Sequence, residues 1–331
     1  QLQKGNDTDP DVVVLKAKGD IDVGQERKDK VVVDEVNESQ FANDDASYNS
    51  VSGLGWTTTD LAGEQKDATD YKLIHNVYEL QNIKNSKRYN EELEKYDYVG
   101  NFMLAKDIEA QETKTWNKNE AEGSVEYLGF LPIGGSQGYF VGKFHGAKHT
   151  INKLYINRPD QDYVGILGRS ENVIVKDVGM VGSEITGRSQ VGGLVGYATA
   201  STITGYNMGD VSGQNNYVGG LVGYAGQNLT VTGYNTGDVS GQGNFVGGLV
   251  GCAIQNLTVT GYNTGDVSGG RFVGGLVGDA WQSNIAGFYD CEINNQKNFG
   301  QDNMNLIENP DSAKKISSYE DISAWDISNK G

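Results

Sequence analysis

The hexapeptide VGGLVG occurs four times and constrains the fold of this 331-residue chain more than any other feature. The copies are spaced by 27, 28 and 27 residues and begin at Val191, Val218, Val246 and Val273. A second motif, GYN-x-GDVSG, lies between them at Gly205, Gly233 and Gly261. Because the period is fixed, each unit is one structural element that buries its apolar face against its neighbours.

Weaker copies extend this array in both directions. The segment YVGILG places Val164 27 residues before Val191, and FVGKFHG places Val141 23 residues before Val164. The segment GFY from Gly287 falls where a fourth GYN would begin. The sequence therefore marks at least six units between about residues 140 and 290.

Each unit contains short runs of Val, Leu, Ile, Thr and Tyr that are broken by Gly, Asn and Asp, a composition typical of strands and turns. Glycine recurs too often for a helix, and a propeller blade needs about 40–45 residues. Twenty-seven residues suffice for three strands with turns. We therefore predict an all-β fold: a right-handed parallel β-helix with 27–28 residues per coil, a short N-terminal helix and a C-terminal cap.

The repeat register predicts columns of identical side chains along the solenoid. The four columns are Tyr206, Tyr234 and Tyr262; Asn207, Asn235 and Asn263; Asp210, Asp238 and Asp266; and Tyr217, Phe245 and Phe272. Stacked amides can bond along the axis, whereas stacked carboxylates repel and should be exposed, solvated or bound to a cation. The glycines of VGGLVG should lie at a tight corner or a close backbone approach.

Four regions follow from these patterns. Residues 1–76 form an irregular β-rich segment of degenerate coils, and residues 77–184 hold a capping helix and the irregular first coils. The helix is expected over 77–86, with Val77, Leu80 and Ile83 on one side. Residues 185–290 are the regular array, and residues 291–331 are the cap that covers an open sheet edge.

Composition excludes two classes of partner. With 27 Lys and Arg against 44 Asp and Glu, the net charge is −17, which argues against nucleic acid and against anionic lipid surfaces. The sequence has no run of 18 apolar residues, so we predict no direct membrane insertion. The N-terminus is unlike a signal peptide, and we expect the native protein to be larger.

The ordered succession of motifs resembles the start of GLUG-type repeat arrays in large bacterial surface proteins. The segments that carry the resemblance are YVGNFMLAKDIEA (98–110), FLPIGG (130–135), FVGKFHGAKHTINKLYINRP (140–159), DYVGILG (162–168) and the closing AWDIS (324–328). The stretch VVVLKAKGDIDVG (12–24) is similar to strands of filamentous haemagglutinin-type adhesins, which are exported by two-partner secretion. At residues 145–149 the chain has HGAKH where the repeat family usually has DG-x-GH.

The resemblance implies a secreted or cell-surface, non-catalytic adhesin or adhesin stalk. Its partners would be a host-cell or matrix glycan or protein, or copies of itself. The alternative is a structural subunit of an extracellular filament or matrix. Similar repeats precede the protease domain of immunoglobulin A-cleaving metallopeptidases, but this chain lacks the HExxH motif that such a peptidase needs.

Three candidate chemistries come from the residues. The column of Asp210, Asp238 and Asp266 could bind calcium, although each unit supplies one Asp and turn chemistry explains it as well. Exposed columns would carry a ligand, with Tyr217, Phe245 and Phe272 as candidates, unless these rings are core. A polysaccharide lyase or hydrolase would need two acids on one face, and the repeat offers one identical acid per coil. We predict no catalytic residues and no cofactor beyond calcium.

The chain has two cysteines, Cys252 and Cys291. In the repeat register they lie on different faces, since Cys252 occupies the position of Tyr197 and Tyr224 while Cys291 aligns with Gly265. We expect two separate thiols, although a disulfide remains the alternative.

Overall fold

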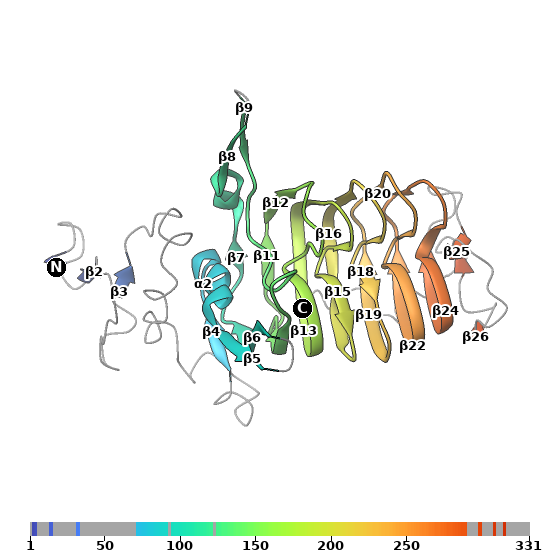
Figure 1. Ribbon diagram of the computed structural model, residues 1–331, viewed down its shortest axis with the longest axis horizontal. Helices are drawn as coiled ribbons and strands as arrows, with labels where there is room; N and C mark the ends of the chain where they lie inside the picture. Colours follow the sequence, from blue (N-terminus) through green and yellow to red (C-terminus); the bar gives the residue numbers. More distant parts are fainter. Residues whose placement is uncertain are drawn as a thin grey trace.

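The chain folds as a parallel β-solenoid. The computed structural model describes residues 71–91, 94–121 and 124–289, and six short strands outside these ranges. Successive coils follow one another along the long axis of the molecule (Figure 1). The predicted parallel β-helix with one short helix before the coils is therefore confirmed.

The elements before the regular array are short and varied. They are β4 (Lys72–Ile74), α2 (Val77–Asn82), η4 (Ile83–Asn85), β5 (Lys87–Asn90), β6 (Lys95–Leu104), β7 (Ile108–Glu109), η5 (Gln111–Thr115), β8 (Lys118–Ala121), β9 (Ser124–Tyr127), β10 (Phe140–His145), β11 (Thr150–Asn152), β12 (Tyr155–Arg158) and β13 (Leu167–Gly187). Strand β6 pairs in parallel with β10, and β10 pairs in parallel with β13.

The regular array consists of short strands separated by turns. Its strands are β14 (Val191–Gly192), β15 (Val195–Thr199), β16 (Thr202–Gly213), β17 (Val218–Gly219), β18 (Val222–Ala225), β19 (Leu229–Asn235), β20 (Val239–Gly241), β21 (Val246–Gly247), β22 (Val250–Asn263), β23 (Val267–Ser268) and β24 (Val273–Tyr289). The described pairings between coils of the array are parallel, as β14 with β17 and β17 with β21 illustrate.

Residues one repeat apart in the sequence pair with each other in this sheet. Val191 pairs with Val218, which pairs with Val246, which pairs with Val273. The GYN motifs also pair residue for residue, and the final GFY pairs with the third GYN through Gly287. One period is thus one coil, as the spacing of 27–28 residues predicts.

The predicted alignment of FVGKFHG is wrong. Val141 does not pair with Val164; it pairs with Val99 of the segment YVGNFML. The segment FLPIGG instead precedes YVGILG in the stack, because Ile133 forms a parallel bridge with Leu167. A Val-Gly dipeptide occurs on two different faces of the coil, so the dipeptide alone could not assign the face.

Aliphatic side chains that point inward form the core. In one coil Val218, Leu221, Val222, Val231 and Val239 are each fully buried. Burying one such side chain stabilises the fold by about 1.5–3 kcal/mol. Since every coil contributes a similar set, the core is a continuous column, which explains how a chain with only 37% apolar residues folds.

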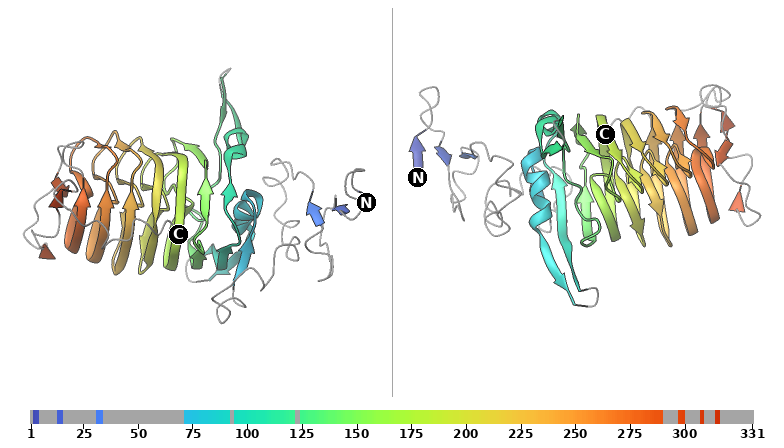
Figure 2. Two further views of the ribbon diagram at one scale, coloured as in Figure 1. Left: turned by 180° about the vertical axis from the view of Figure 1, so that it is seen from behind. Right: turned by 45° about the horizontal axis from the view of Figure 1, so that its top comes forward.

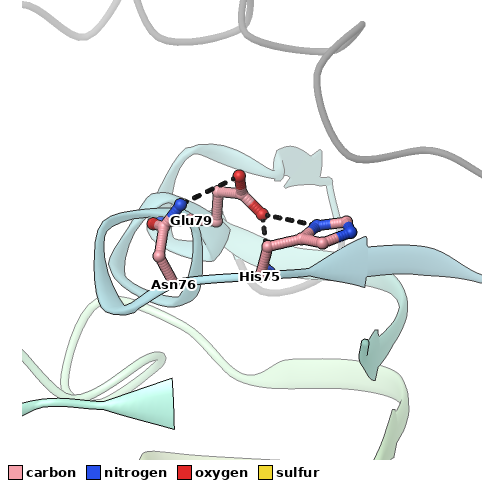
Figure 3. Close-up of polar contacts among 3 residues, drawn as sticks. All are labelled: His75, Asn76 and Glu79. Carbon is pink, nitrogen blue, oxygen red and sulfur yellow. Dashed lines mark hydrogen bonds and ion pairs between the residues drawn. The ribbon is translucent and has the colours of Figure 1, made fainter. Parts of the chain in front are cut away.

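The helix α2 is capped by its own sequence. Oδ1 of Asn76 accepts a hydrogen bond of 2.9 Å from the backbone N–H of Glu79. The Glu79 carboxylate accepts one of 2.8 Å from the N–H of His75 (Figure 3). The pattern is similar to a capping box, except that Glu79 bonds to the N–H of His75, the residue before the N-cap Asn76. The predicted apolar side of the helix is confirmed, because Val77, Leu80 and Ile83 are buried.

Two antiparallel hairpins leave the regular stack. Strands β8 and β9 form a two-stranded ribbon that projects away from the coils (Figures 1 and 2). Strands β5 and β6 pair through Tyr89 and Tyr96, whose rings are 51% and 52% exposed. Both hairpins belong to the irregular first coils.

Short strands are described beyond the array. Strands β25 (Lys297–Phe299), β26 (Ile307–Glu308) and β27 (Lys314–Lys315) each pair in parallel with β24. Near the N-terminus, β1 (Leu2–Lys4) is antiparallel to β2 (Val13–Leu15), which is parallel to β3 (Val31–Val33). The rest of the expected cap and most of residues 1–70 lie outside the described residues.

Candidate functional site

The asparagine column is a buried hydrogen-bond ladder. Asn207, Asn235 and Asn263 are fully buried. Nδ2 of Asn207 donates to Oδ1 of Asn235 at 2.8 Å, and Nδ2 of Asn235 donates to Oδ1 of Asn263 at 2.8 Å. Each Nδ2 also donates to the carbonyl two residues further on, at 2.6–2.8 Å. The amides bond along the axis as predicted, and their role is structural.

The second glycine of VGGLVG packs against this ladder and against the backbone of the next coil. A Cβ atom on Gly220 would lie 2.5 Å from Cγ of Asn235 and 2.2 Å from the carbonyl oxygen of Gly248. A Cβ on the first glycine, Gly219, would lie 2.1 Å from the carbonyl oxygen of Val222. The predicted close backbone approach is confirmed. The glycine of VGGLVG and the asparagine of GYN therefore pack against each other inside the solenoid, so a larger residue at the glycine would displace the asparagine.

The tyrosine column of the GYN motif is stacked face to face. Ring centroids of Tyr206 and Tyr234, and of Tyr234 and Tyr262, are 4.8 Å apart with nearly parallel planes. Burial raises the pKa of Tyr234 to about 12. Because both faces of Tyr234 are covered by the neighbouring rings, a ligand could contact Tyr234 only at its ring edge.

The aspartate column is exposed and bonds to backbone. Oδ1 of Asp210 accepts a hydrogen bond of 3.1 Å from the N–H of Asp238, and Oδ1 of Asp238 accepts one of 3.0 Å from the N–H of Asp266. Across the residues that the structure describes, no group of three or more His, Cys, Asp or Glu side chains is arranged to hold a metal ion. The carboxylates thus act as links between neighbouring coils.

The fourth column, which includes Tyr217, Phe245 and Phe272, lies directly before the hexapeptide. Its rings are half-buried and stacked, with centroids 5.1 and 4.9 Å apart. All three residues have positive φ, between 56° and 68°. The equivalent residues of the two preceding coils, Tyr163 and Gln190, have φ of 61° and 51°.

A left-handed backbone is uncommon for bulky residues and costs about 1–3 kcal/mol where the surrounding structure imposes it. Here it recurs in five successive coils at one register position. The turn that begins the hexapeptide imposes this conformation. In four of the five coils the residue at this position is aromatic: Tyr163, Tyr217, Phe245 and Phe272.

Another column lies directly after the hexapeptide, and the sequence analysis did not identify it as a site. It consists of Arg169, Tyr197, Tyr224, Cys252 and Asp279, which pair in register. Tyr224 stacks on Tyr197 at 5.3 Å and meets Tyr217 edge-on at 5.1 Å. The two columns therefore flank one corner of the solenoid and touch each other across it.

We call this surface the corner strip and define it by its ring and guanidinium residues. They are Tyr139, Tyr163, Arg169, Tyr197, Tyr217, Tyr224, Phe245, Arg271 and Phe272. The residues that flank each hexapeptide copy could have indicated the strip, because at least one of the two is aromatic in each copy. Their identity changes from copy to copy, so a search for columns of identical residues does not detect them.

Arg169 forms one end of the strip and sits among three tyrosines. Its guanidinium carbon lies 4.2 Å from the ring centre of Tyr139 and 5.2 Å from those of Tyr163 and Tyr197. Its Nε is buried and has no hydrogen-bond partner in the described part of the chain. Burial raises the pKa of Tyr139, while the positive charge of Arg169 opposes that rise.

The other end of this column contains Cys252 and Asp279. Cys252 is a buried free thiol, and burial, aided by the neighbouring Asp279 carboxylate, raises its pKa to about 12. Burial also raises the pKa of Asp279, whose Oδ1 is buried without a hydrogen-bond partner among the described residues. The expectation of separate thiols agrees with this free Cys252; Cys291 lies outside the described residues.

Comparisons with known proteins give partial matches. No protein-family model matches the chain. Over 128 residues, which are 37% of this chain, it is 33% identical to halomucin of Haloquadratum walsbyi (strain DSM 16790 / HBSQ001). The aligned region is 1% of halomucin, so the chain matches a very small part of that protein.

Among solved structures, the chain is similar to a candidate immunoglobulin A1 protease from Bacteroides ovatus. The TM-score is 0.47 and the identity 19%, over 66% of this chain and 65% of the other. Within the described ranges, no helix has the length and apolarity that a membrane span requires.

Proposed function

We propose that this chain is part of an extracellular surface protein and acts as an adhesin or an adhesin stalk without catalytic activity. The observation that carries the proposal is the in-register ladder of parallel coils, in which side-chain amides, aromatic rings and backbone groups repeat from coil to coil. Such a solenoid is rigid, and it presents long surfaces along its axis.

Two further observations support an extracellular role. The chain shares 33% identity over 128 residues with a small part of halomucin, a very long protein. The regular coils are acidic and carry polar amide ladders on exposed positions, such as Gln227 with Gln255 and Gln214 with Gln242. Polar, hydrogen-bonded surfaces keep a long solenoid soluble outside the cell.

Fab fragments raised against residues 185–290 test the proposal on intact producing cells. We expect the Fab to label the cell surface without permeabilisation and to reduce attachment of the cells to host-cell or matrix-coated surfaces. A Fab against an unrelated surface protein is the control. Labelling that requires permeabilised cells would overturn the surface location. Labelling without any effect of the Fab or of gene deletion on attachment would overturn the adhesin role and favour a structural matrix role.

A further inference from the structure

Arginines without a carboxylate partner mark the corner strip. Between residues 160 and 289 the sequence has four basic residues: Arg169, Lys176, Arg188 and Arg271. Arg188 forms a bidentate pair with Asp162 at 2.7 and 2.6 Å, and Lys176 faces Asp177 at 4.0 Å. Neither Arg169 nor Arg271 has an ion pair in the part of the chain that the structure describes.

Both of these arginines lie over aromatic rings of the strip. Arg169 sits among three tyrosines, and the guanidinium carbon of Arg271 lies 5.4 Å from the ring centre of Phe272. Arg271 precedes Phe272 in the fourth coil after that of Arg169. Four coil spacings of about 4.8 Å separate the two coils by about 19 Å. In a chain with net charge −17, unpaired cations at both ends of one surface leave it ready for an anion.

Phenol hydroxyls lie in the part of the strip nearer Arg169, whereas the coils nearer Arg271 carry Phe245 and Phe272. The hydroxyls of Tyr197, Tyr217 and Tyr224 make no hydrogen bond within the described residues, and the three residues are half-buried. The ring faces are occupied by neighbouring rings of the strip. Beside Arg169 a ligand therefore meets phenol groups and ring edges, which suits the hydroxyl groups of a sugar chain.

We propose that the corner strip binds an anionic polysaccharide that lies along the solenoid axis. Its carboxylate or sulfate groups pair with the guanidinium groups of Arg169 and Arg271, and its sugar hydroxyls bond to the tyrosine hydroxyls between them. Planar guanidinium groups suit this recognition because they can donate two parallel hydrogen bonds to one anionic group. The inference rests on the proposed adhesin function and names the class of its ligand.

Binding of the purified chain to defined polymers tests this inference. The probes are polygalacturonate, dextran sulfate, uncharged dextran and poly-L-glutamate, measured by calorimetry at low salt and at physiological salt. We expect binding to polygalacturonate or dextran sulfate, which distinguishes carboxylate from sulfate, and no binding to dextran. No binding to either anionic polysaccharide would overturn the inference. Equal or tighter binding of poly-L-glutamate would also overturn it, in favour of an acidic peptide.

Matched charge variants locate the site. Arg169→Gln and Arg271→Gln should each weaken binding roughly tenfold or more, because each removes a charge-assisted hydrogen bond. Arg188→Gln removes the same charge from a residue bonded to Asp162 and should leave the affinity unchanged. An equal loss in Arg188→Gln would show that only net charge matters and would overturn the site.

Two variants, Arg271→Gln and Tyr197→Phe, keep the test valid if Arg169→Gln unfolds. Arg271 is exposed, so its variant tests the charge at the other end, and Tyr197→Phe removes one strip hydroxyl while keeping the ring. Both should weaken binding without lowering the unfolding temperature, and unchanged affinity in both would overturn the inference. If Fab fragments block cell attachment while no polyanion binds, the adhesin function stands and only this ligand assignment fails.

Discussion

Nδ2 of Asn207 donates a hydrogen bond of 2.8 Å to Oδ1 of Asn235, which lies one coil further along the solenoid. Asn235 repeats the bond to Asn263, so the ladder has one direction. Met180 pairs with Asn207 before the ladder and Tyr289 pairs with Asn263 after it. The buried amides therefore bond to one another over three coils inside an otherwise largely apolar core. A shift in the pairing of any of these coils would break the bonds.

Removing the central amide should destabilise the fold strongly. In Asn235→Ala, Oδ1 of Asn263 and the carbonyl of Gly237 lose their amide donor inside the core. We expect a loss of about 2–4 kcal/mol in the free energy of unfolding in urea, since unsatisfied buried groups cost about 1–3 kcal/mol each. Gln227→Ala, in an exposed amide ladder, is the control and should change stability by less than about 0.5 kcal/mol. Similar losses in the two variants would contradict this account.

Adding one methyl group at Gly220 should be as damaging. The Cβ of Gly220→Ala would meet the Gly248 carbonyl at 2.2 Å and Asn235 at 2.5 Å, and backbone cannot yield as a side chain does. We expect a loss of about 3 kcal/mol or more in thermal or urea unfolding. Gly182→Ala has open space, with its closest contact at 3.9 Å, and carries only the cost of its φ of 59°, about 1 kcal/mol. Equal losses in the free energy of unfolding for Gly220→Ala and Gly182→Ala would contradict the close contact of Gly220 with the backbone of Gly248.

The stacked tyrosines should make stability fall in alkali. Burial raises the pKa of Tyr234 from 10 to about 12, so between these values the folded protein keeps a proton that the unfolded chain has released. Stability is therefore full below about pH 10 and is lost as pH rises toward 12. Tyr234→Phe should flatten this decline in unfolding experiments from pH 9 to 12. Identical pH profiles for the two proteins would refute the buried-phenol explanation.

Cys252 should be inert in the folded protein. Its thiol is buried, and its pKa of about 12 leaves almost no thiolate at pH 8. We expect iodoacetamide to leave Cys252 unmodified in native buffer and to alkylate it fully in guanidinium, as read by peptide mass spectrometry. A cysteine placed on the exposed strand surface by Thr202→Cys should react within the same native incubation. Rapid native labelling of Cys252 would mean that the coil opens there.

Identical side chains were the most predictable part of the molecule. The columns of Tyr206, Asn207 and Asp210 follow from a fixed period, because an in-register parallel sheet stacks residue on residue. The exposure of the aspartate column followed from the repulsion of stacked carboxylates, but the burial of the asparagine column was not predictable in the same way. The buried amide of Asn207 and the exposed carboxylate of Asp210 lie three residues apart in one coil, and local turns decide which side chain points inward.

Repetition predicted one column of the corner strip, that of Tyr217, Phe245 and Phe272, but not the strip as a whole. The column after the hexapeptide changes from Arg169 to Tyr197, then to Cys252 and Asp279, so a search for identical side chains does not find it. The left-handed backbone at Tyr217 and Phe245 is equally invisible in the sequence, because aromatic residues rarely adopt it. The misplacement of Val141 has a similar origin, since one dipeptide serves two faces of the coil.

Electron microscopy of the purified protein and of immunogold-labelled producing cells tests the central claim most directly. The account predicts monodisperse short rods in the purified sample and gold label on projections rooted in the cell surface. Long regular fibres assembled from this chain would contradict it and would identify a polymer subunit, and label confined to the cell interior would contradict the surface role.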